Sequence, residues 1–274
     1  MAEVTAAAVK ELREKTGLPM MECKKALQES GGDQQAAVDW LRKQGIKTKE
    51  TRIGRETSAG RIAIYTDLAA GVGTMIELKC ESAPVAGSPE FKQFATDVAK
   101  QLAVGPGAST PEQLLAQPST KAGLTLADQK DDMFNRLREV FNLTRIIRID
   151  GACGGYVHHD GTKGALVEVT GGNAEVAKDV AMHVVAQGPE VVSKEELDPQ
   201  AIDKERTILS AAARGEGKPD NIIAKMVEGR LKNFFAERVL VEQPFVKDDS
   251  QTVGKLADAA KMKIVRFVRW ELGK

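Results

Sequence analysis

The residues of this chain that are best suited to chemistry lie in one glycine-rich stretch, GACGGYVHHDGTKG, at residues 151–164. The stretch contains a thiol, Cys153, and two imidazoles, His158 and His159, and all three groups can bind a metal ion. Their spacings of five residues and one residue are not those of a structural zinc site, and no fourth ligand is near in the sequence. We therefore predict that no metal binds here, and we interpret the stretch as the turn of a hairpin.

Motifs typical of enzymes are also missing from the sequence. There is no G-x-x-x-x-G-K-[ST] string, so the chain lacks the phosphate-binding loop of many nucleoside triphosphatases. The glycines of the stretch at 151–164 do not have the strand-to-helix setting of a dinucleotide site, and no serine or cysteine lies in a nucleophile motif. We expect no catalytic residue, no cofactor and no enzymatic activity.

A second feature is the string GLPMMECKKAL at residues 17–27. On a helix, Met20, Cys23 and Leu27 follow one another at i, i+3 and i+7, and we expect them to share one buried face. Met21 then points elsewhere, among lysines, which is an unusual place for a large apolar side chain. For Met20, core packing and contact with a partner both remain open.

Composition limits the classes of partner. The 274 residues are 42% hydrophobic and 28% charged, which is typical of a folded chain with two or three domains. Lys+Arg and Asp+Glu are equal at 39 each, so no long-range positive field attracts nucleic acid or anionic lipid. We expect a protein or a small molecule as partner, with no direct nucleic-acid binding and no membrane binding.

The cysteines and the N-terminus indicate the compartment. Cys23, Cys80 and Cys153 are odd in number and far apart, which favours buried free thiols in a reducing environment over disulfides. No apolar run is long enough to span a membrane, and the N-terminal residues predict an amphipathic helix and not a signal peptide. We therefore expect a cytoplasmic location.

The elements that position these residues begin with three predicted helices. Thr5 and Asp33 are suited to cap the first and third of them, Gly17 to end the first, and Gly45 to end the third. Three short helices with tight turns form a small module over residues 1–50 that resembles the ubiquitin-associated fold.

A polar, glycine-containing linker is expected at residues 51–60, and beyond it the hydrophobic period changes from helical to alternating. Half-buried strands are expected at residues 60–67 and 74–81, because apolar side chains occupy alternate positions there. Ser88 then opens a helix. These elements make up a first core subdomain, residues 61–142.

A similar set of elements follows. Strands are expected at residues 143–150 and 164–170, on either side of the glycine-rich turn, and Asn173 can cap the next helix. This helix and the one after Ser88 share the string Ala-x-Asp-Val-Ala, which begins at Ala95 and Ala177. We interpret the repeat as an internally duplicated α+β core.

The second core subdomain, residues 143–274, carries an insertion. From about residue 193 to 238 the pattern is helical, with a break at residues 215–219. Two helices joined by so short a turn must fold back as an antiparallel coiled-coil hairpin, which can bind a partner or a second copy of the chain. The predicted fold class is therefore α+β, with an N-terminal three-helix module, a duplicated core and this hairpin insertion.

Four strings, in this order and with these spacings, resemble the family of bacterial translation elongation factor Ts: VKELREKTGLPMMECKKAL at 9–27, DVAMHVVA at 179–186, GKPDNIIAKMVEGR at 217–230 and QPFV at 243–246. The resemblance covers nearly the whole chain. It implies a guanine-nucleotide exchange factor that promotes GDP release from the GTPase elongation factor Tu. The alternative is a ubiquitin-associated-like adaptor that binds a protein partner without accelerating exchange.

The resemblance also implies contact residues. Arg13, Met20, Met21 and Lys24 match the family's N-terminal motif, which docks on a helix of the GTPase domain, and His158 matches its Tyr-x-His element. Methionine suits such a surface because its side chain adapts in shape, while lysine contributes to orientation.

The residues themselves also allow simpler interpretations. Arg13 and Lys24 are typical of a solvated helix face, and His158 is typical of an exposed turn. We expect His183 to pair on the helix surface with Asp179, one turn earlier.

The chain departs from the family after the strand that ends in cysteine. The family has Thr-Asp-Phe-Val there, and its Asp and Phe help to dislodge the magnesium ion of the GTPase. This chain has Ser82, Ala83, Pro84 and Val85 instead, so both the carboxylate and the ring are missing. We expect these four residues to form a loop that presses on the magnesium site of the partner with a weaker effect. The strand that begins NLTRIIR likewise lacks the family's Gly-Glu-Asn lead-in.

Overall fold

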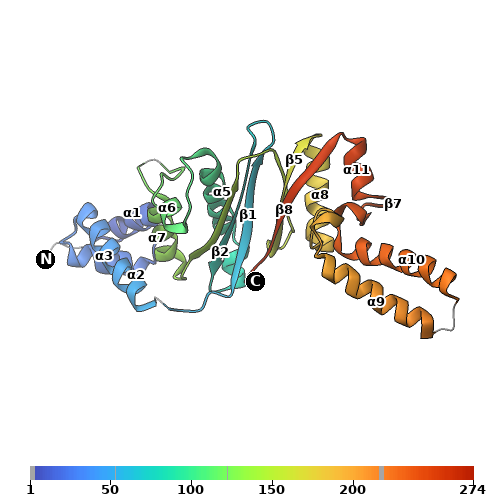
Figure 1. Ribbon diagram of the computed structural model, residues 1–274. Helices are drawn as coiled ribbons and strands as arrows, with labels where there is room; N and C mark the ends of the chain where they lie inside the picture. Colours follow the sequence, from blue (N-terminus) through green and yellow to red (C-terminus); the bar gives the residue numbers. More distant parts are fainter. Residues whose placement is uncertain (1–3, 53, 122, 216–218) are drawn as a thin grey trace. The chain divides into compact units, whose positions relative to one another are not determined.

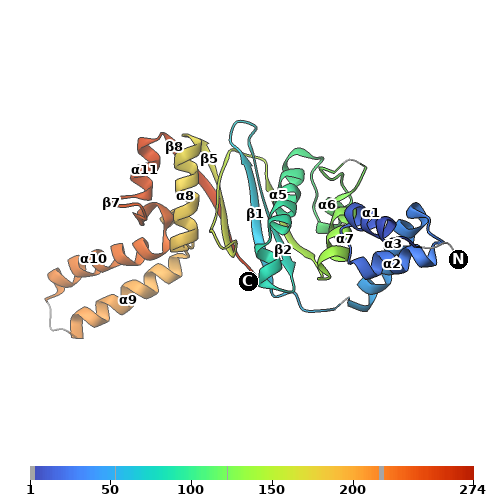
Figure 2. The same ribbon diagram turned by 180° about the vertical axis from the view of Figure 1, so that it is seen from behind.

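The computed structural model describes residues 4–52, 54–121, 123–215 and 219–274 (Figure 1, Figure 2). The chain is a mixed α+β protein with helices at its N-terminal end and several small antiparallel sheets. Among the described residues, no helix is both long and apolar enough to cross a membrane. The chain divides into two compact units, the first made of Met1–Arg61, Ile76–Ile146 and Gly273, and the second of Ile62–Met75, Ile147–Leu272 and Lys274.

Three helices begin the first unit: α1 (Ala6–Thr16), α2 (Met20–Glu29) and α3 (Gln34–Arg52). Thr5 and Asp33 cap α1 and α3 as predicted, because each side chain accepts a hydrogen bond from a backbone N–H of the first turn. Gly17 ends α1 in the left-handed conformation. The prediction that α3 ends at Gly45 is wrong, since the helix continues to Arg52. One glycine inside a helix costs only about 1 kcal/mol.

The first sheet has the strand order β1-β2-β3, with β1 at Ala59–Asp67, β2 at Val72–Cys80 and β3 at Asn142–Ile149. The alternating pattern predicted β1 and β2 correctly. Strand β2 is not half-buried, however, because every residue except Lys79 is buried. The reason is that both faces of β2 are covered, and on one of them Met75 packs in a cluster with Cys153 and Leu166.

Strand β2 carries a buried carboxylate, Glu77, which is 2% exposed. Burial alone would raise the pKa of Glu77, but hydrogen bonds from the Thr144 hydroxyl, the Arg145 guanidinium and the Gly273 N–H outweigh it and lower the pKa. The charge is therefore kept inside the fold, where it joins β2 to β3 and to Gly273.

Four further helices of the first unit lie between β2 and β3 in the sequence: α4 (Ala83–Gly87), α5 (Pro89–Val104), α6 (Pro111–Leu115) and α7 (Leu126–Leu137). The Ser88 hydroxyl caps α5 as predicted, and its apolar face, including Phe91 and Phe94, is fully buried. Helix α7 begins at a reciprocal capping box between Thr125 and Asp128.

In the second unit, the strands β4 (Cys153–Val157), β5 (Lys163–Gly171) and β8 (Met262–Glu271) form an antiparallel sheet in the order β4-β5-β8. The prediction that residues 151–164 form only a turn is therefore wrong, because five of these fourteen residues form strand β4. The strand expected at 143–150 is confirmed as β3, but it pairs within the first sheet and not with β5.

The glycines of β4 have a packing role that explains the error. A Cβ atom on Gly154 would lie 2.3 Å from the carbonyl carbon and oxygen of Ala177 in helix α8 (Ala174–Gln187). Only glycine lets the strand and the helix approach so closely. Asn173 caps α8 as predicted.

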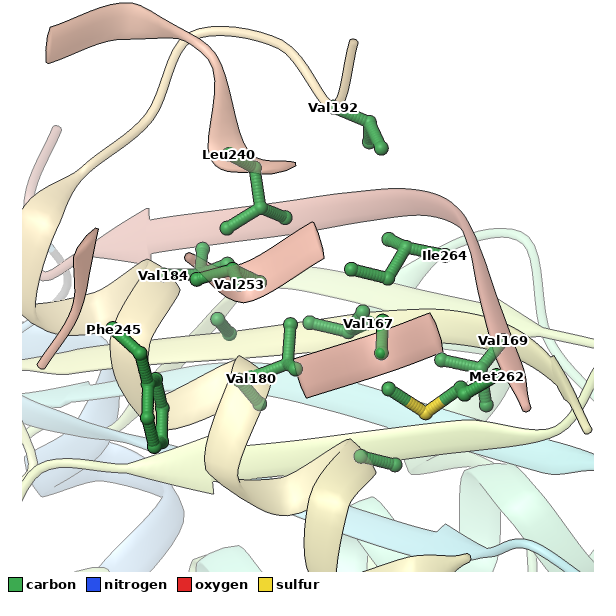
Figure 3. Packing of buried hydrophobic residues seen from close by; sticks show 14 of the residues in the cluster. Val167, Val169, Val180, Val184, Val192, Leu240, Phe245, Val253, Met262 and Ile264 are labelled. Carbon is green, nitrogen blue, oxygen red and sulfur yellow. The ribbon is translucent and has the colours of Figure 1, made fainter. Parts of the chain in front are cut away.

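Figure 3 shows the apolar core that α8 shares with the sheet and with α11 (Val253–Ala259). The second unit also contains η1 (Lys194–Glu196), α9 (Pro199–Gly215), α10 (Asp220–Arg238), η2 (Leu240–Glu242), β6 (Pro244–Phe245) and β7 (Asp248–Thr252). Helices α9 and α10 lie side by side in both views (Figure 1, Figure 2) and share a small core of Ala213, Ile223, Val227 and Leu231.

All three cysteines are free and buried, as predicted. Burial raises the pKa of Cys80 to about 11 and that of Cys153 to about 11, because a thiolate is poorly solvated in the interior. Cys80 and Cys153 are therefore packing residues that stay protonated at neutral pH.

Candidate functional site

Helix α2 presents two methionines to water. Met20 is 51% exposed and Met21 is 72% exposed, whereas Cys23 and Leu27 are fully buried. The prediction that Met20 shares the buried face is therefore wrong. Met20 is the first residue of α2, and a helical side chain leans toward the N-terminus, where no earlier turn of this helix covers it. Met21 is exposed, as its spacing predicts.

Helices α1 and α2 also carry charged side chains. Lys24 on α2 and Arg13 on α1 are both exposed. Lys25 lies over the ring of Trp40, with its Nζ 5.9 Å from the ring centre, and Glu22 forms an ion pair with Arg138. We call Arg13, Met20, Met21 and Lys24 the α2 surface, because α2 supplies three of its four residues. It combines exposed apolar area with positive charge, which suits contact with a protein.

The prediction of a loop at Ser82–Val85 is wrong. Ser82 is the N-cap residue of the short helix α4, and Pro84 lies in its first turn, which are both favoured positions for these residue types. The Ser82 hydroxyl donates to a carboxylate oxygen of Glu139, and the Ser82 N–H donates to the other oxygen at 3.1 Å. Ala83 and Pro84 are exposed, while Val85 is half-buried. We call Ser82–Val85 the α4 segment.

His158 lies at the turn between β4 and β5. Its N–H donates to the carbonyl of Lys163, and its own carbonyl accepts from Gly161, so the turn is closed by two backbone bonds. The side chain is 39% exposed, and its Nδ1 lies 3.2 Å from Oδ1 of Asp160. Hydrogen bonds from Thr162, chiefly from its N–H, lower the pKa of Asp160 to about 2, so this carboxylate is ionised.

An open pocket of about 490 Å³ lies beside His158 in the second unit. Tyr156, Met182 and Val246 give it apolar walls, and Lys163 contributes positive charge near Asp160. Val246 is itself 41% exposed. Exposed apolar atoms with charges at the edge are typical of a surface that a protein partner covers.

His183 is not a surface residue, so the predicted pair with Asp179 is wrong. It is fully buried, and Asp179 pairs instead with Lys247, whose Nζ lies 2.6 Å from its Oδ1. His183 Nδ1 accepts from the Val246 N–H at 3.1 Å, so Nε2 carries the proton and donates to Gln243 Oε1 at 2.9 Å. His183 thereby holds the QPFV segment, and with it Val246 at the pocket.

This arrangement predicts a pH-dependent stability. Burial lowers the pKa of His183, so the unfolded chain binds a proton more readily than the folded one. Stability is then fully present above the ordinary pKa of about 6.5 and is lost as pH falls below it. Between pH 7.5 and 5.5 we expect the native chain to lose about 1 kcal/mol more than a His183→Gln variant, whose amide does not titrate.

Urea unfolding of both proteins at the two pH values measures this difference. His158 and His159 are present in both proteins, so their contributions cancel. Equal pH dependence of the two chains would show that His183 is not kept neutral by the fold.

The structure does not bring all the expected site residues together in one unit. The α2 surface and the α4 segment belong to the first unit, and His158 belongs to the second. Within the described parts of the chain, no group of three or more His, Cys, Asp or Glu side chains is arranged to hold a metal ion.

Comparisons with known proteins agree with the resemblance seen in the sequence. The profile of the family "Elongation factor TS" matches residues 81–274. Elongation factor Ts of Methylococcus capsulatus is 44% identical over 274 residues, which cover 98% of this chain and 92% of that protein. The corresponding protein of Thioalkalivibrio sulfidiphilus is 40% identical, with 98% and 92% covered, and that of Kineococcus radiotolerans is 39% identical, with 100% of both chains covered.

Proposed function

The chain belongs to the elongation factor Ts family, the nucleotide exchange factors of elongation factor Tu, and we propose that it contacts this GTPase through two separate surfaces. It is an exchange factor and not an enzyme. Like the rest of the family, it acts in the bacterial cytoplasm, where translation elongation takes place. The proposed surfaces are the α2 surface with the α4 segment in the first unit, and His158 with its pocket in the second.

Each part of the chain receives a role in this proposal. We assign residues 1–50 to a ubiquitin-associated-like module that docks on the GTPase domain. Residues 51–60, which begin at the end of α3 and reach the start of β1, link this module to the core. The core consists of two related subdomains, 61–142 and 143–274, whose repeated elements are β1, β2 and α5 in one and β4, β5 and α8 in the other. Their helices share Ala-x-Asp-Val-Ala at matching places, which supports the duplication.

The physical task of an exchange factor is a difference in affinity. It must bind the nucleotide-free GTPase more tightly than the GDP-bound form. By linkage, the bound factor then lowers the affinity of the GTPase for GDP by the same factor. We propose that the two surfaces hold separate parts of the GTPase while the α4 segment and His158 disturb its magnesium and phosphate site. GTP binding then displaces the factor.

One observation supports the docking proposal most directly. Met21 is 72% exposed on a well-packed helix whose neighbouring residues Cys23 and Leu27 are fully buried. A single exposed methionine is unremarkable, but here it lies beside a second one, Met20, and beside the exposed Lys24. A partner helix that covers the α2 surface would remove both methionines from water.

A release assay tests the proposal. Elongation factor Tu is loaded with fluorescent GDP, unlabelled GDP is added in excess, and the loss of fluorescence is followed with and without the purified chain. Acceleration that saturates with factor concentration supports exchange. Binding without acceleration would favour the alternative, an adaptor that does not catalyse exchange, and the absence of both would exclude the proposal.

The α4 segment should contribute less than the docking surfaces. It has no carboxylate to compete for magnesium and no ring to act as a wedge, and its Ser82 hydroxyl is already engaged by Glu139. We expect simultaneous replacement of Ser82, Pro84 and Val85 by alanine to slow GDP release at saturating factor by less than about tenfold, equivalent to roughly 1.4 kcal/mol.

The control for this variant is Lys92→Ala, on the exposed side of α5 in the same unit. Circular dichroism first establishes that both proteins fold. If the triple variant bound the GTPase normally but no longer released GDP, Pro84 or its neighbours would be the wedge, and the weaker role assigned to them would be wrong.

For the hairpin of α9 and α10 we propose binding to a second copy of the chain. Ile208 is 52% exposed and Ile222 is 44% exposed, so each helix carries an apolar side chain that its partner helix does not cover. Association through these residues would make the sedimentation coefficient rise with concentration, and a constant value would exclude it.

A further inference from the structure

Helix α7 ends in an unusual way. Arg138, its C-cap residue, has φ 59° and ψ 27°, which is the left-handed conformation, and its N–H donates to the carbonyl of Phe134. Glycine normally occupies such a position, because a side chain makes this conformation unfavourable. Among the described residues, Lys261 is the other non-glycine residue with a positive φ, 52°.

The side chain of Arg138 contacts helix α2 beside the α2 surface. Its guanidinium donates to the carboxylate of Glu22, the residue that follows Met21 on α2. The two residues are 116 positions apart in the sequence, so the ion pair joins α2 to the end of α7. Both side chains are partly buried, which protects the pair from screening by water more than a fully exposed pair.

The next residue contacts the α4 segment. Both carboxylate oxygens of Glu139 accept hydrogen bonds from Ser82, one from its N–H and one from its hydroxyl. Val140 then donates its N–H to the carboxylate of Glu81 at 2.9 Å. Three consecutive residues therefore bind α2 on one side and the start of α4 on the other, and bonds to a charged carboxylate are stronger than neutral ones.

We propose that Arg138 and Glu139 are positioning residues that join the α2 surface to the α4 segment, so that docking of α2 on the GTPase sets the place of α4. This inference rests on the proposed function. We call the contacts of Arg138 with Glu22 and of Glu139 with Ser82 the junction. Without the junction, α4 would reach its target by an independent motion, and its effective concentration there would fall. The affinity of the α2 surface itself would be unchanged, because neither Arg138 nor Glu139 belongs to it.

The variant Arg138→Gly tests the junction. Glycine adopts the left-handed conformation without strain, so the end of α7 is kept while the ion pair to Glu22 is lost. We expect the maximal rate of GDP release at saturating factor to fall about three- to fivefold, while the half-saturating factor concentration changes less than twofold. Lys261→Gly is the matched control, since it also relaxes a left-handed residue but lies before β8 in the second unit. It should leave both quantities unchanged.

A combination of variants shows whether the junction acts through α4. In the chain with Ser82, Pro84 and Val85 replaced by alanine, Arg138→Gly should cause no further loss, because the segment that it positions is already disabled. The same three- to fivefold loss in that background would overturn the proposal, as would an unchanged maximal rate of Arg138→Gly in the native background. If Arg138→Gly fails to fold, Glu22→Gln breaks the same ion pair from the other side.

Failure of the junction can be distinguished from failure of the proposed function. If the native chain accelerates GDP release and the triple variant slows it, while Arg138→Gly and Glu22→Gln do not, then only the junction is wrong. If the native chain itself fails to accelerate release, the proposed function is wrong, and the junction with it.

Discussion

A chain that carries both Met21→Ala and His158→Ala is expected to bind nucleotide-free elongation factor Tu about 30- to 1,000-fold more weakly than the native chain. Truncation of an interface anchor commonly costs about 1 to 2 kcal/mol. The two residues belong to separate compact units, so their losses should add to about 2 to 4 kcal/mol. Isothermal titration calorimetry of the double variant and of both single variants measures the loss of affinity from each substitution.

Folding should be unaffected, which makes the result interpretable. Met21 is 72% exposed and the His158 side chain is 39% exposed, so neither residue contributes much to a core. A matched control replaces two exposed valines, Val104 in the first unit and Val265 in the second, by alanine. A large drop in melting temperature with unaltered affinity would show that Met21 and His158 are structural, and the two docking surfaces would then have to be placed elsewhere.

The largest effect on stability is expected from Gly154→Ala. The added methyl group would lie 2.3 Å from backbone atoms of Ala177, and backbone cannot move aside as a flexible side chain can. Helix α8 would have to shift away from β4 and loosen the core shown in Figure 3. We expect the free energy of unfolding to fall by about 3 kcal/mol, the upper end of the usual cost of overpacking.

Gly229→Ala provides the opposite case. Gly229 lies inside α10, its φ is not positive, and a Cβ there would meet no atom within 4 Å. Alanine should therefore stabilise the helix by about 0.5 to 1 kcal/mol. Denaturant unfolding of both variants measures the free energy of unfolding, which should fall for Gly154→Ala and rise for Gly229→Ala. A neutral Gly154→Ala would indicate that β4 and α8 are not in close contact and that the glycine serves only as a turn residue.

The elements that the sequence predicted correctly depend on neighbouring residues. Thr5, Asp33, Ser88 and Asn173 cap helices because each side chain reaches an N–H three residues further on. Such signals can be read from a short string of residues. The alternation of apolar side chains in β1 and β2 is equally local.

The errors concern residues whose role depends on distant parts of the chain. The local sequence indicates a turn at Gly154, but the residue lies in close contact with Ala177. It likewise indicates a surface position for His183, which is hydrogen-bonded to Gln243 and Val246 in the interior. The apolar neighbours Val180 and Val184, on the same face of α8, were an available signal that His183 is buried.

For the same reason, only part of the candidate site could be predicted from the sequence. Exposure of Met21 followed from helix geometry alone. Exposure of Met20 did not, because it depends on the place where α2 begins. Arg138 and Glu139 gave no signal in the sequence, since Glu22 and Ser82, which they bind, are 116 and 57 residues away.

The buried thiols open a direct way to watch α4 on its target. Maleimide dyes react with thiolates, and at neutral pH the buried Cys80 and Cys153, with pKa values of about 11, supply almost none; Cys23 is fully buried as well. A single new thiol at the exposed Ala83 can thus be labelled while all three native cysteines are retained. Energy transfer from a dye at this position to fluorescent GDP would report the approach of α4 to the nucleotide in real time.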